Sequence, residues 1–503
     1  MHKKQIALIV LDGWGYRKEA KDNAIAQAHK PNFDGIWSKY PHTLLEASGV
    51  KFGLPDGQMG NSELGHMTIG AGRILYQDIV RISKSISSGE FKDNPAFVEL
   101  FAHVNKYDST LHIAGLVSPG GIHSHMSHLF GFLEIAKNAG IKKIAIHAIT
   151  DGRDTPPQAG ASYIKELEDY IEKLGVGEIA SVSGRLYAMD RDQRWERLAK
   201  AEEVIFDGKG TECNIEPHLY VENLYKEGKM DEHLEPFVCV NKEGKSYSVN
   251  KNDGFFLFNF RADRMRMITE RIMEKYKDEN VCLVTMTEYK KEYTCSVAFP
   301  ATKINETLGK TISENGMTQA HIAETEKFAH ATYFLNCGEE VPYKGEEQIL
   351  VPSPQGVLTY DLAPKMSAGG VADKAIEQIE KGTDFIFVNF ANADMVGHTS
   401  EVPAIIIAVE EVDRELGRIL EALKLGGGIA LVTADHGNAE VNIDPITGLR
   451  HTSHTSDLVP FILTDENKKL KSEGTLADIT PTILELYGIE KPKEMTGESL
   501  IKN

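Results

Sequence analysis

A chain of 503 residues, 41% hydrophobic and 26% charged, is long enough for two or more folded domains. The net charge of -19 excludes non-specific nucleic-acid binding, and any anionic substrate would need a locally basic site. The five cysteines form no C-x-x-C pair, and no apolar run approaches the ~18 residues of a membrane span. We expect a cytoplasmic protein that binds neither nucleic acid nor membrane.

The chain begins with a strand-like apolar run, Ile6–Leu11, that ends in Asp12. Continuous apolar runs are typical of buried parallel strands, and open α/β sheets bind ligands just past the carboxyl ends of their strands. Asp12 is therefore a candidate ligand, although an Asp-Gly pair is also a common turn. Ser62 follows within the glycine-rich stretch 58–66. A serine hydroxyl is a weak nucleophile until a base or a metal activates it.

The region 76–307 has the pattern of a second α/β unit. Strand-like runs alternate with amphipathic stretches, which indicates a parallel or mixed sheet. The expected strands are 111–117, 144–149, 179–182 and 255–258, and the expected helices are 129–138, 159–174, 193–206 and 262–275. The polar stretch 208–253 is expected to form loops and short strands.

Polar side chains follow these strands, and eight of the fifteen arginines lie between Arg153 and Arg266. Because arginine binds phosphate and carboxylate bidentately, the cluster supplies the basic patch that an anionic substrate requires. Ion pairing with acids such as Asp190 and Asp263 is the alternative for any single arginine. The arginines expected to line a substrate site are Arg153, Arg185, Arg191, Arg261 and Arg264. Of the three histidines His123, His125 and His128, we expect at most one to contact substrate.

The α/β pattern resumes from about residue 312. Apolar runs at 385–390, 429–433 and 459–463 predict strands, and 403–425 predicts a long amphipathic helix. Carboxylates and imidazoles follow these runs. Together with the serine and the first aspartate they are Asp12, Ser62, Asp394, His398, Asp435, His436 and His454.

Carboxylates combined with imidazoles suit Mn²⁺ or Zn²⁺. Three aspartates and three histidines are too many for one ion that keeps an open position, but they fit two. Two ions could clamp a phosphoryl group and lower the pKa of the serine hydroxyl. Each residue alone has an ordinary explanation, as a turn or surface residue; their joint occurrence at the ends of separate runs favours a site.

The motifs at 12–15, 60–66, 394–398, 434–438 and 451–455 together resemble the alkaline phosphatase superfamily and, more narrowly, the cofactor-independent (2,3-bisphosphoglycerate-independent) phosphoglycerate mutase family. The segments 150–155 and 258–264 resemble that family's transferase domain. The resemblance covers essentially the whole chain. One departure is Pro119, where the family has an aspartate.

The resemblance implies two Mn²⁺ ions per subunit. One would be held by Asp394, His398 and His454, and the other by Asp12, Ser62, Asp435 and His436. His454 is preferred to His451 because it directly precedes the segment that begins at Thr455.

The resemblance also implies roles for the substrate-contacting residues. Ser62 would accept the phosphoryl group, Asp154 would act as general acid and base on the glycerate hydroxyls, and Lys327 would lie near the phosphoryl group. The residues that would hold the substrate's carboxylate and phosphate are His123, Arg153, Arg185, Arg191, Arg261 and Arg264.

The implied activity is interconversion of 3-phosphoglycerate and 2-phosphoglycerate, in glycolysis and gluconeogenesis, by a monomer that needs no 2,3-bisphosphoglycerate. The implied architecture is a phosphatase-like metal-binding domain, 1–75 and 308–503, with a substrate-binding transferase domain, 76–307, inserted in it. Because water would hydrolyse a phosphoserine, we expect the domains to close over the substrate, with hinges near 74–78 and 300–307.

Two alternatives remain. Another phosphomutase, phosphatase or sulfatase of the superfamily would share the metal residues but should lack the Arg153-Asp154 and Arg261/Arg264 set. A catalytically silent metal-binding or scaffold protein should lack Ser62 or a ligand.

Overall fold

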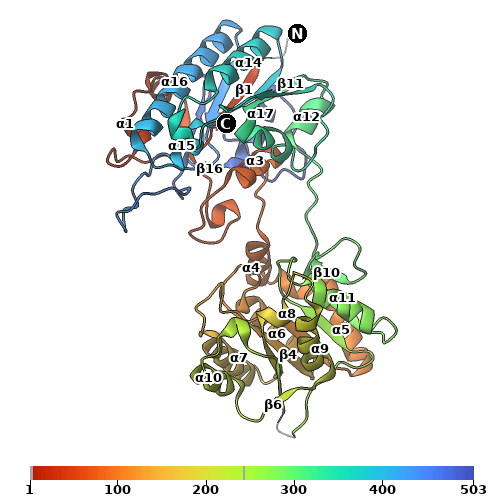
Figure 1. The fold of residues 1–503 in the computed structure, drawn as a ribbon. Coiled ribbons are helices and arrows are strands. Elements are labelled where there is room, and N and C mark those ends of the chain that lie inside the picture. Colours follow the sequence, from red (N-terminus) through yellow and green to blue (C-terminus); the bar gives the residue numbers. More distant parts are fainter. Residues whose placement is uncertain (1–3, 242–243, 503) are drawn as a thin grey trace. The chain divides into compact units, whose positions relative to one another are not determined.

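The computed structural model describes residues 4–241 and 244–502 and divides the chain into two compact units (Figure 1). The first unit comprises 1–77 and 303–503, and the second comprises 78–302. Each unit is built on its own eight-stranded sheet.

The sheet of the first unit has the order β12-β11-β13-β1-β14-β15-β2-β16. Its strands are β1 (Ile6–Leu11), β2 (His42–Glu46), β11 (Gln319–Glu324), β12 (Glu346–Val351), β13 (Phe385–Phe390), β14 (Ile429–Thr433), β15 (Val459–Leu463) and β16 (Gly474–Thr475). Strand β1 pairs in parallel with both β13 and β14, whereas β15 runs antiparallel to β14 and β2. The central strands are buried along their whole length, as their continuous apolar runs predict.

Helices cover this sheet. They are α1 (Ala24–Gln27), α2 (Pro31–Lys39), α3 (Ser62–Ala71), α12 (Leu308–Glu314), α13 (Thr325–Ala329), α14 (Ala368–Lys381), α15 (Asn392–Gly397), α16 (Val402–Leu425) and α17 (Ile479–Tyr487). Helix α14 packs on β11 and β13 and against the long helix α16, which starts with a proline in its first turn.

The sheet of the second unit has the order β10-β9-β8-β3-β4-β5-β7-β6. Its strands are β3 (Leu111–Leu116), β4 (Ile144–Thr150), β5 (Glu178–Gly184), β6 (Thr211–Cys213), β7 (Phe237–Cys239), β8 (Gly254–Leu257), β9 (Cys282–Thr287) and β10 (Ser296–Phe299). Its helices are α4 (Asp78–Ser88), α5 (Pro95–Tyr107), α6 (Met126–Asn138), α7 (Gly160–Leu174), α8 (Arg185–Ala188), α9 (Trp195–Asp207), α10 (Pro217–Lys226) and α11 (Arg266–Lys275). The β3-β4-β5 core is parallel.

The expected α/β class is confirmed, and each predicted strand and helix is present with small shifts at its ends. One expectation is wrong. The stretch 208–253 contains the ten-residue helix α10 in addition to short strands. Val221 is the one fully buried residue of α10, and Tyr220, Leu224 and Tyr225 pack beside it at helical spacing. This short period lies within a largely polar stretch, where the sequence reading missed it.

Two further features bear on the sequence expectations. The glycine-rich stretch after residue 60 is helical, since α3 runs from Ser62 to Ala71. A methyl group at Gly70 would overlap the carbonyl oxygen of Leu335, so this glycine permits close helix packing and not a bend. Among the described residues, no helix has the length and apolarity to traverse a bilayer.

Candidate active site

Three aspartates of the first unit converge at the carboxyl ends of three neighbouring strands. Asp12 follows β1, Asp394 lies in α15 just after β13, and Asp435 follows β14. Because β13, β1 and β14 are adjacent and parallel, their carboxyl ends meet at one edge of the sheet. All three carboxylates are buried, so each needs a compensating partner there.

Ser62 is the first residue of α3, and its position is set by the helix cap. The side chain of Asn61 accepts a hydrogen bond of 2.9 Å from the Leu64 amide, which fixes where the helix starts. Ser62 Oγ lies 2.7 Å from Lys327 Nζ, 2.8 Å from His436 Nε2 and 3.4 Å from Asp12 Oδ1. The hydroxyl thus faces a cation, an imidazole and a carboxylate at once.

Lys327, on α13, joins two of the aspartates. Its Nζ donates 2.6 Å hydrogen bonds to Asp12 Oδ1 and to Asp394 Oδ2. Burial by itself would lower the pKa of Lys327, but the two carboxylates outweigh it and leave the pKa raised. Burial likewise favours a higher pKa for Asp12 and Asp394, yet the Lys327 charge holds both pKa values below the usual range. The lysine is therefore cationic and the two aspartates are ionised.

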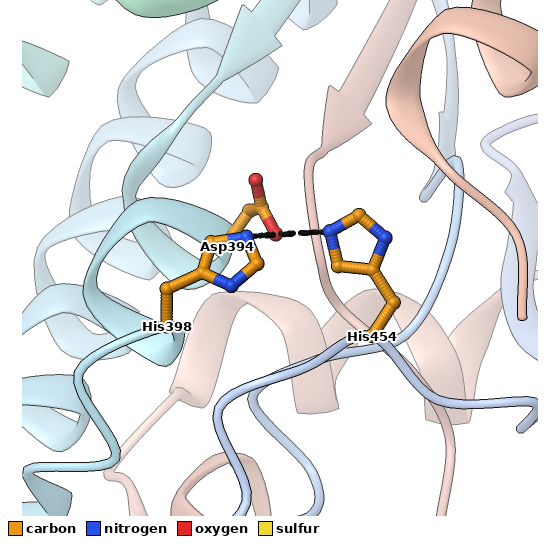
Figure 2. A group of neighbouring side chains, drawn as sticks. All are labelled: Asp394, His398 and His454. Atoms are coloured by element: carbon orange, nitrogen blue, oxygen red, sulfur yellow. Dashed lines mark hydrogen bonds and ion pairs between the residues drawn. The ribbon is translucent and has the colours of Figure 1, made fainter. Parts of the chain in front are cut away.

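Asp394, His398 and His454 form the first candidate metal group (Figure 2). Asp394 Oδ1 lies 3.2 Å from His398 Nε2 and 3.3 Å from His454 Nε2. The Nδ1–H of each histidine points to a backbone carbonyl, Thr452 O at 2.8 Å and Gly60 O at 2.9 Å. These carbonyls orient each ring so that Nε2 faces the carboxylate, the orientation that a ligating histidine needs. Of the two histidines considered from sequence, His454 is the one in this group.

The other candidate ligands cluster around Asp12 and Asp435. His436 Nε2 lies 3.4 Å from Asp435 Oδ2 and 3.6 Å from Asp12 Oδ1. Asp12 forms groups of close ligand atoms with Asp394 and His436, and with His66 and Asp435. The expected residues are thus brought together, in overlapping sets.

The protonation of this cluster matches a cation site. Burial, and then the Asp12 charge, raise the pKa of Asp435 well above its usual value, and its buried Oδ2 has no hydrogen-bond partner. Burial lowers the pKa of His436 to about 4, so its ring is neutral at pH 7. Burial disfavours the ionised form of Asp435, and a bound cation would offset that cost. A carboxyl oxygen without a partner beside neutral imidazole nitrogens is therefore a donor set that fits a divalent cation.

His66 was not expected from sequence to take part. Its Nδ1 lies 2.8 Å from the Ser62 carbonyl oxygen and 3.4 Å from Asp435 Oδ2, and its Nε2 lies 3.0 Å from Asn389 Nδ2. Asn389 also donates to Asp12 Oδ2 at 2.8 Å. The available signal was the four-residue spacing from Ser62, which places both side chains on one helix face only once α3 is known to be a helix.

In the second unit, Arg185 joins two aspartates of the loop after β4. Its Nη1 lies 2.6 Å from Asp151 Oδ1 and 2.7 Å from Asp154 Oδ2. Asp151 also accepts hydrogen bonds from Ser118 Oγ at 2.7 Å and from the Asp154 amide at 3.0 Å. Burial favours a higher pKa for Asp151, but these donors bring the pKa below its usual value. Asp151, to which sequence reasoning gave no role, anchors the loop that presents Asp154.

Asp263 gathers a second set of charges. Arg191 Nη1 lies 3.1 Å from Asp263 Oδ2, and Arg261 Nε lies 3.0 Å from Asp263 Oδ1. His123 lies between the two carboxylates, with Nε2 3.8 Å from Asp154 Oδ2 and Nδ1 3.9 Å from Asp263 Oδ1. Burial, and then the Arg185 charge, lower the pKa of His123 to about 4, so this imidazole is neutral at pH 7. Arg191 and Arg261 are therefore both paired with Asp263, within a basic cluster.

The remaining arginines belong to the same cluster. Arg264 Nη1 donates to the Met189 carbonyl at 3.1 Å, and Arg153 Nη1 lies 3.4 Å from Glu232 Oε1. The pKa of Arg264 is lowered, first by burial and then by the positive charges of Arg185, Arg191 and Arg153. Guanidinium groups close enough to repel one another leave a surface that favours an anion.

Comparison of the whole chain with known proteins shows the family to which it belongs. Residues 4–491 match the model of the metalloenzyme superfamily. The chain is 48% identical, over 100% of both chains, to the 2,3-bisphosphoglycerate-independent phosphoglycerate mutase of Clostridioides difficile (strain 630). It is 47% identical to the corresponding mutase 1 of Methanosarcina barkeri (strain Fusaro / DSM 804), over 99% of this chain and 98% of that one.

A solved structure agrees with these matches. The crystal structure of Leishmania mexicana phosphoglycerate mutase at low cobalt concentration has 29% sequence identity and a TM-score of 0.54, and the match covers 99% of this chain and 98% of that one. The chain therefore belongs to the 2,3-bisphosphoglycerate-independent phosphoglycerate mutase family, within the metalloenzyme superfamily.

Proposed function

We propose that this protein interconverts 3-phosphoglycerate and 2-phosphoglycerate through a phosphoserine at Ser62, without 2,3-bisphosphoglycerate. The observation that carries the proposal is the setting of Ser62 Oγ, 2.7 Å from Lys327 Nζ and 2.8 Å from His436 Nε2. A hydroxyl held between a cation and a neutral base is set up as a nucleophile. We further propose that the protein acts as a monomer in the cytoplasm.

The metal ligands of this proposal all belong to the first unit. Asp394, His398 and His454 would hold one Mn²⁺, and Asp12, Ser62, Asp435 and His436 would hold a second. When bound, two divalent cations lower the pKa of a coordinated hydroxyl and neutralise phosphoryl oxygens.

The first transfer uses Ser62 and Asp154. Ser62 first loses its hydroxyl proton to solvent. The alkoxide Oγ then attacks the phosphorus of 3-phosphoglycerate in line with the bond to the glycerate C3 oxygen, and that bond breaks. The second transfer releases the same alkoxide. Protonated Asp154 gives its proton to the departing oxygen. The Lys327 ammonium, 2.7 Å from Ser62 Oγ, offsets the charge of the phosphoryl oxygens throughout.

The second transfer reverses these roles at the neighbouring carbon. Asp154 now takes the proton of the C2 hydroxyl, whose oxygen attacks the phosphoserine, and the bond from phosphorus to Ser62 Oγ breaks. Arg185 holds Asp154 Oδ2 at 2.7 Å and so aims the carboxylate during both steps. His123, Arg153, Arg191, Arg261 and Arg264 would hold the glycerate carboxylate and phosphate. The reaction requires that residues of both units reach the same substrate molecule.

The test is conversion of 3-phosphoglycerate to 2-phosphoglycerate, read through coupled enolase with no added 2,3-bisphosphoglycerate. The metal-stripped wild type and Ser62→Ala are each assayed with Mn²⁺ and with EDTA. We expect isomerisation that needs Mn²⁺ and is lost in the variant. Release of inorganic phosphate without isomerisation would instead make the protein a phosphatase of the superfamily.

A further inference from the structure

Glu440 is a fully buried carboxyl group in the segment after β14, and it is not one of the candidate ligands. Its Oε2 accepts two backbone hydrogen bonds, from the Gly15 amide at 3.0 Å and the Asn438 amide at 2.9 Å. Its Oε1 accepts a hydrogen bond from the Thr455 hydroxyl. One side chain therefore links its own segment, at Asn438, to the segment at Thr455, 15 residues away, and to the segment at Gly15, 425 residues away.

Each of these partners adjoins a candidate metal ligand. Gly15 follows Asp12 by three residues, Asn438 follows His436 by two, and Thr455 directly follows His454. The Asn438 side chain extends the connection to a fourth segment, since its Nδ2 donates to Asp394 Oδ1 at 2.8 Å. Glu440 thus contacts, directly or through Asn438, four of the segments that carry candidate ligands; the segment of Ser62 is not among these four.

The surrounding backbone is shaped around this carboxyl group. A methyl group at Gly15 would overlap the Glu440 carboxyl carbon, and one at Gly437 would overlap Oε1. Two glycines therefore make the room that the side chain occupies. Burying a carboxyl group is costly, and burial raises the pKa of Glu440 to about 7. Both oxygens of this buried carboxyl group accept hydrogen bonds from the surrounding loops, so the group can fix the positions of those loops.

We propose that Glu440 is a positioning residue that holds the loops bearing Asp12, His436 and His454 in register for metal binding. It acts through the Gly15 and Asn438 amides and the Thr455 hydroxyl, and it touches neither metal nor substrate. The inference rests on the proposed ligand set.

The experiment is calorimetric titration of Mn²⁺ into metal-stripped full-length protein, with thermal unfolding of each metal-free variant recorded in parallel. Removing a residue that orients a metal ligand typically lowers metal affinity by about 10–100-fold. Glu440→Ala should therefore weaken Mn²⁺ binding by about that factor. Glu440→Gln should stay within about 3-fold of wild type, because its amide oxygen can accept both backbone N–H groups while its NH₂ donates to Thr455.

Two further variants complete the design. Thr455→Val removes one of the three contacts and should weaken one of the two binding steps. Glu346→Ala is the matched control, since its buried carboxylate in the same unit accepts from Asn336 Nδ2 at 2.9 Å and the Tyr343 amide at 3.1 Å, without a candidate ligand among these partners.

The outcomes separate the two proposals. Wild type that binds no Mn²⁺ overturns the metal set itself. Wild-type affinity in Glu440→Ala overturns the positioning role, as does an equal loss of affinity in Glu346→Ala. If Glu440→Ala does not fold, Thr455→Val decides, and wild-type affinity in that variant overturns the proposal.

Discussion

Lys327 Nζ lies 2.7 Å from Ser62 Oγ, although 265 residues separate the two in the chain. The pair exists because β11, which leads into α13, lies next but one to β1 in the sheet, so that α13 and α3 both begin at the same edge. A lysine whose pKa is raised by two buried carboxylates keeps its charge at pH 7. Such a lysine supplies charge to the phosphoryl group and does not serve as a base.

Lys327→Met tests this role. The variant keeps the volume of the side chain but loses the charge, and we expect kcat to fall by about 10²–10³, the usual cost of one electrostatic contact in the transition state. Mn²⁺ affinity should not fall, because the Lys327 ammonium bonds to carboxylates of Asp12 and Asp394 that the metal would also use, and its removal frees them. Steady-state kinetics and titration calorimetry measure the two effects. A variant with wild-type kcat would show that the charge is not used.

Asp154→Asn tests proton transfer on the glycerate. An amide cannot exchange the proton, so isomerisation should fall by about 10²–10⁴, the contribution of a general acid and base. The fold should persist because Arg185 keeps Asp151, 2.6 Å from its Nη1, as a partner. The coupled assay measures the loss, and circular dichroism checks the fold. Isomerisation within a few-fold of wild type would remove Asp154 from the mechanism.

Arg185→Ala should destabilise the second unit. The side chain is 2% exposed and pairs with Asp151, which is itself buried, so the variant leaves a charge without its partner in the interior. Breaking such a pair costs about 3–5 kcal/mol. Arg153→Ala is the matched control: its side chain is 54% exposed, and we expect a change below about 0.5 kcal/mol. Urea unfolding measures both, and equal losses would contradict the assignment.

Stability should fall in acid through His128. Its pKa is lowered to about 3, first by burial and then by His125, from an ordinary value of 6.5. Between these two values the unfolded chain binds a proton that the folded chain does not, so the free energy of unfolding decreases as the pH drops. Well below pH 6.5 this contribution is about 1.4 kcal/mol per pH unit.

His128→Gln removes that titration. In urea unfolding between pH 7 and pH 5 with EDTA present, the variant should lose stability less steeply on acidification than the wild type. The difference should approach one proton bound on unfolding at the acid end. The same pH dependence in both proteins would mean that His128 titrates normally in the folded state.

Much of the fold could be predicted because its signals are local. The runs before Asp12, at 385–390 and at 429–433 are apolar on both faces, and a short run of this kind is typical of a strand buried within a parallel sheet. Helix α10 shows the limit. It packs on α7, and its core-facing residues 220, 221, 224 and 225 give a helical period that is too short to stand out within the polar stretch 208–253.

The residues of the candidate site, like the strands, could be predicted where the signal was local. Residues directly after apolar strands were identifiable because strand ends in parallel sheets face ligands. The contacts of Asp151 and His66 were not predictable, although Asp151 directly follows β4, because they cross the fold, to Arg185 and to Asn389 respectively. Asp263 was foreseen as an ion-pair partner, but its particular partners, Arg191 and Arg261, were not. Apart from the four-residue spacing between Ser62 and His66, no spacing along the chain encodes these contacts.

By itself the sequence determined the α/β class, the strands, and the set of carboxylates, imidazoles and arginines available for chemistry. These depend on hydrophobic period and residue type, which are properties of short segments. Only the tertiary structure decided which of these groups contact one another and how those contacts shift their pKa values. Lys327 acquires its raised pKa from Asp12 and Asp394, and Glu440 its three partners, because strand order and loop packing bring distant segments within hydrogen-bond reach, where burial strengthens every charge interaction.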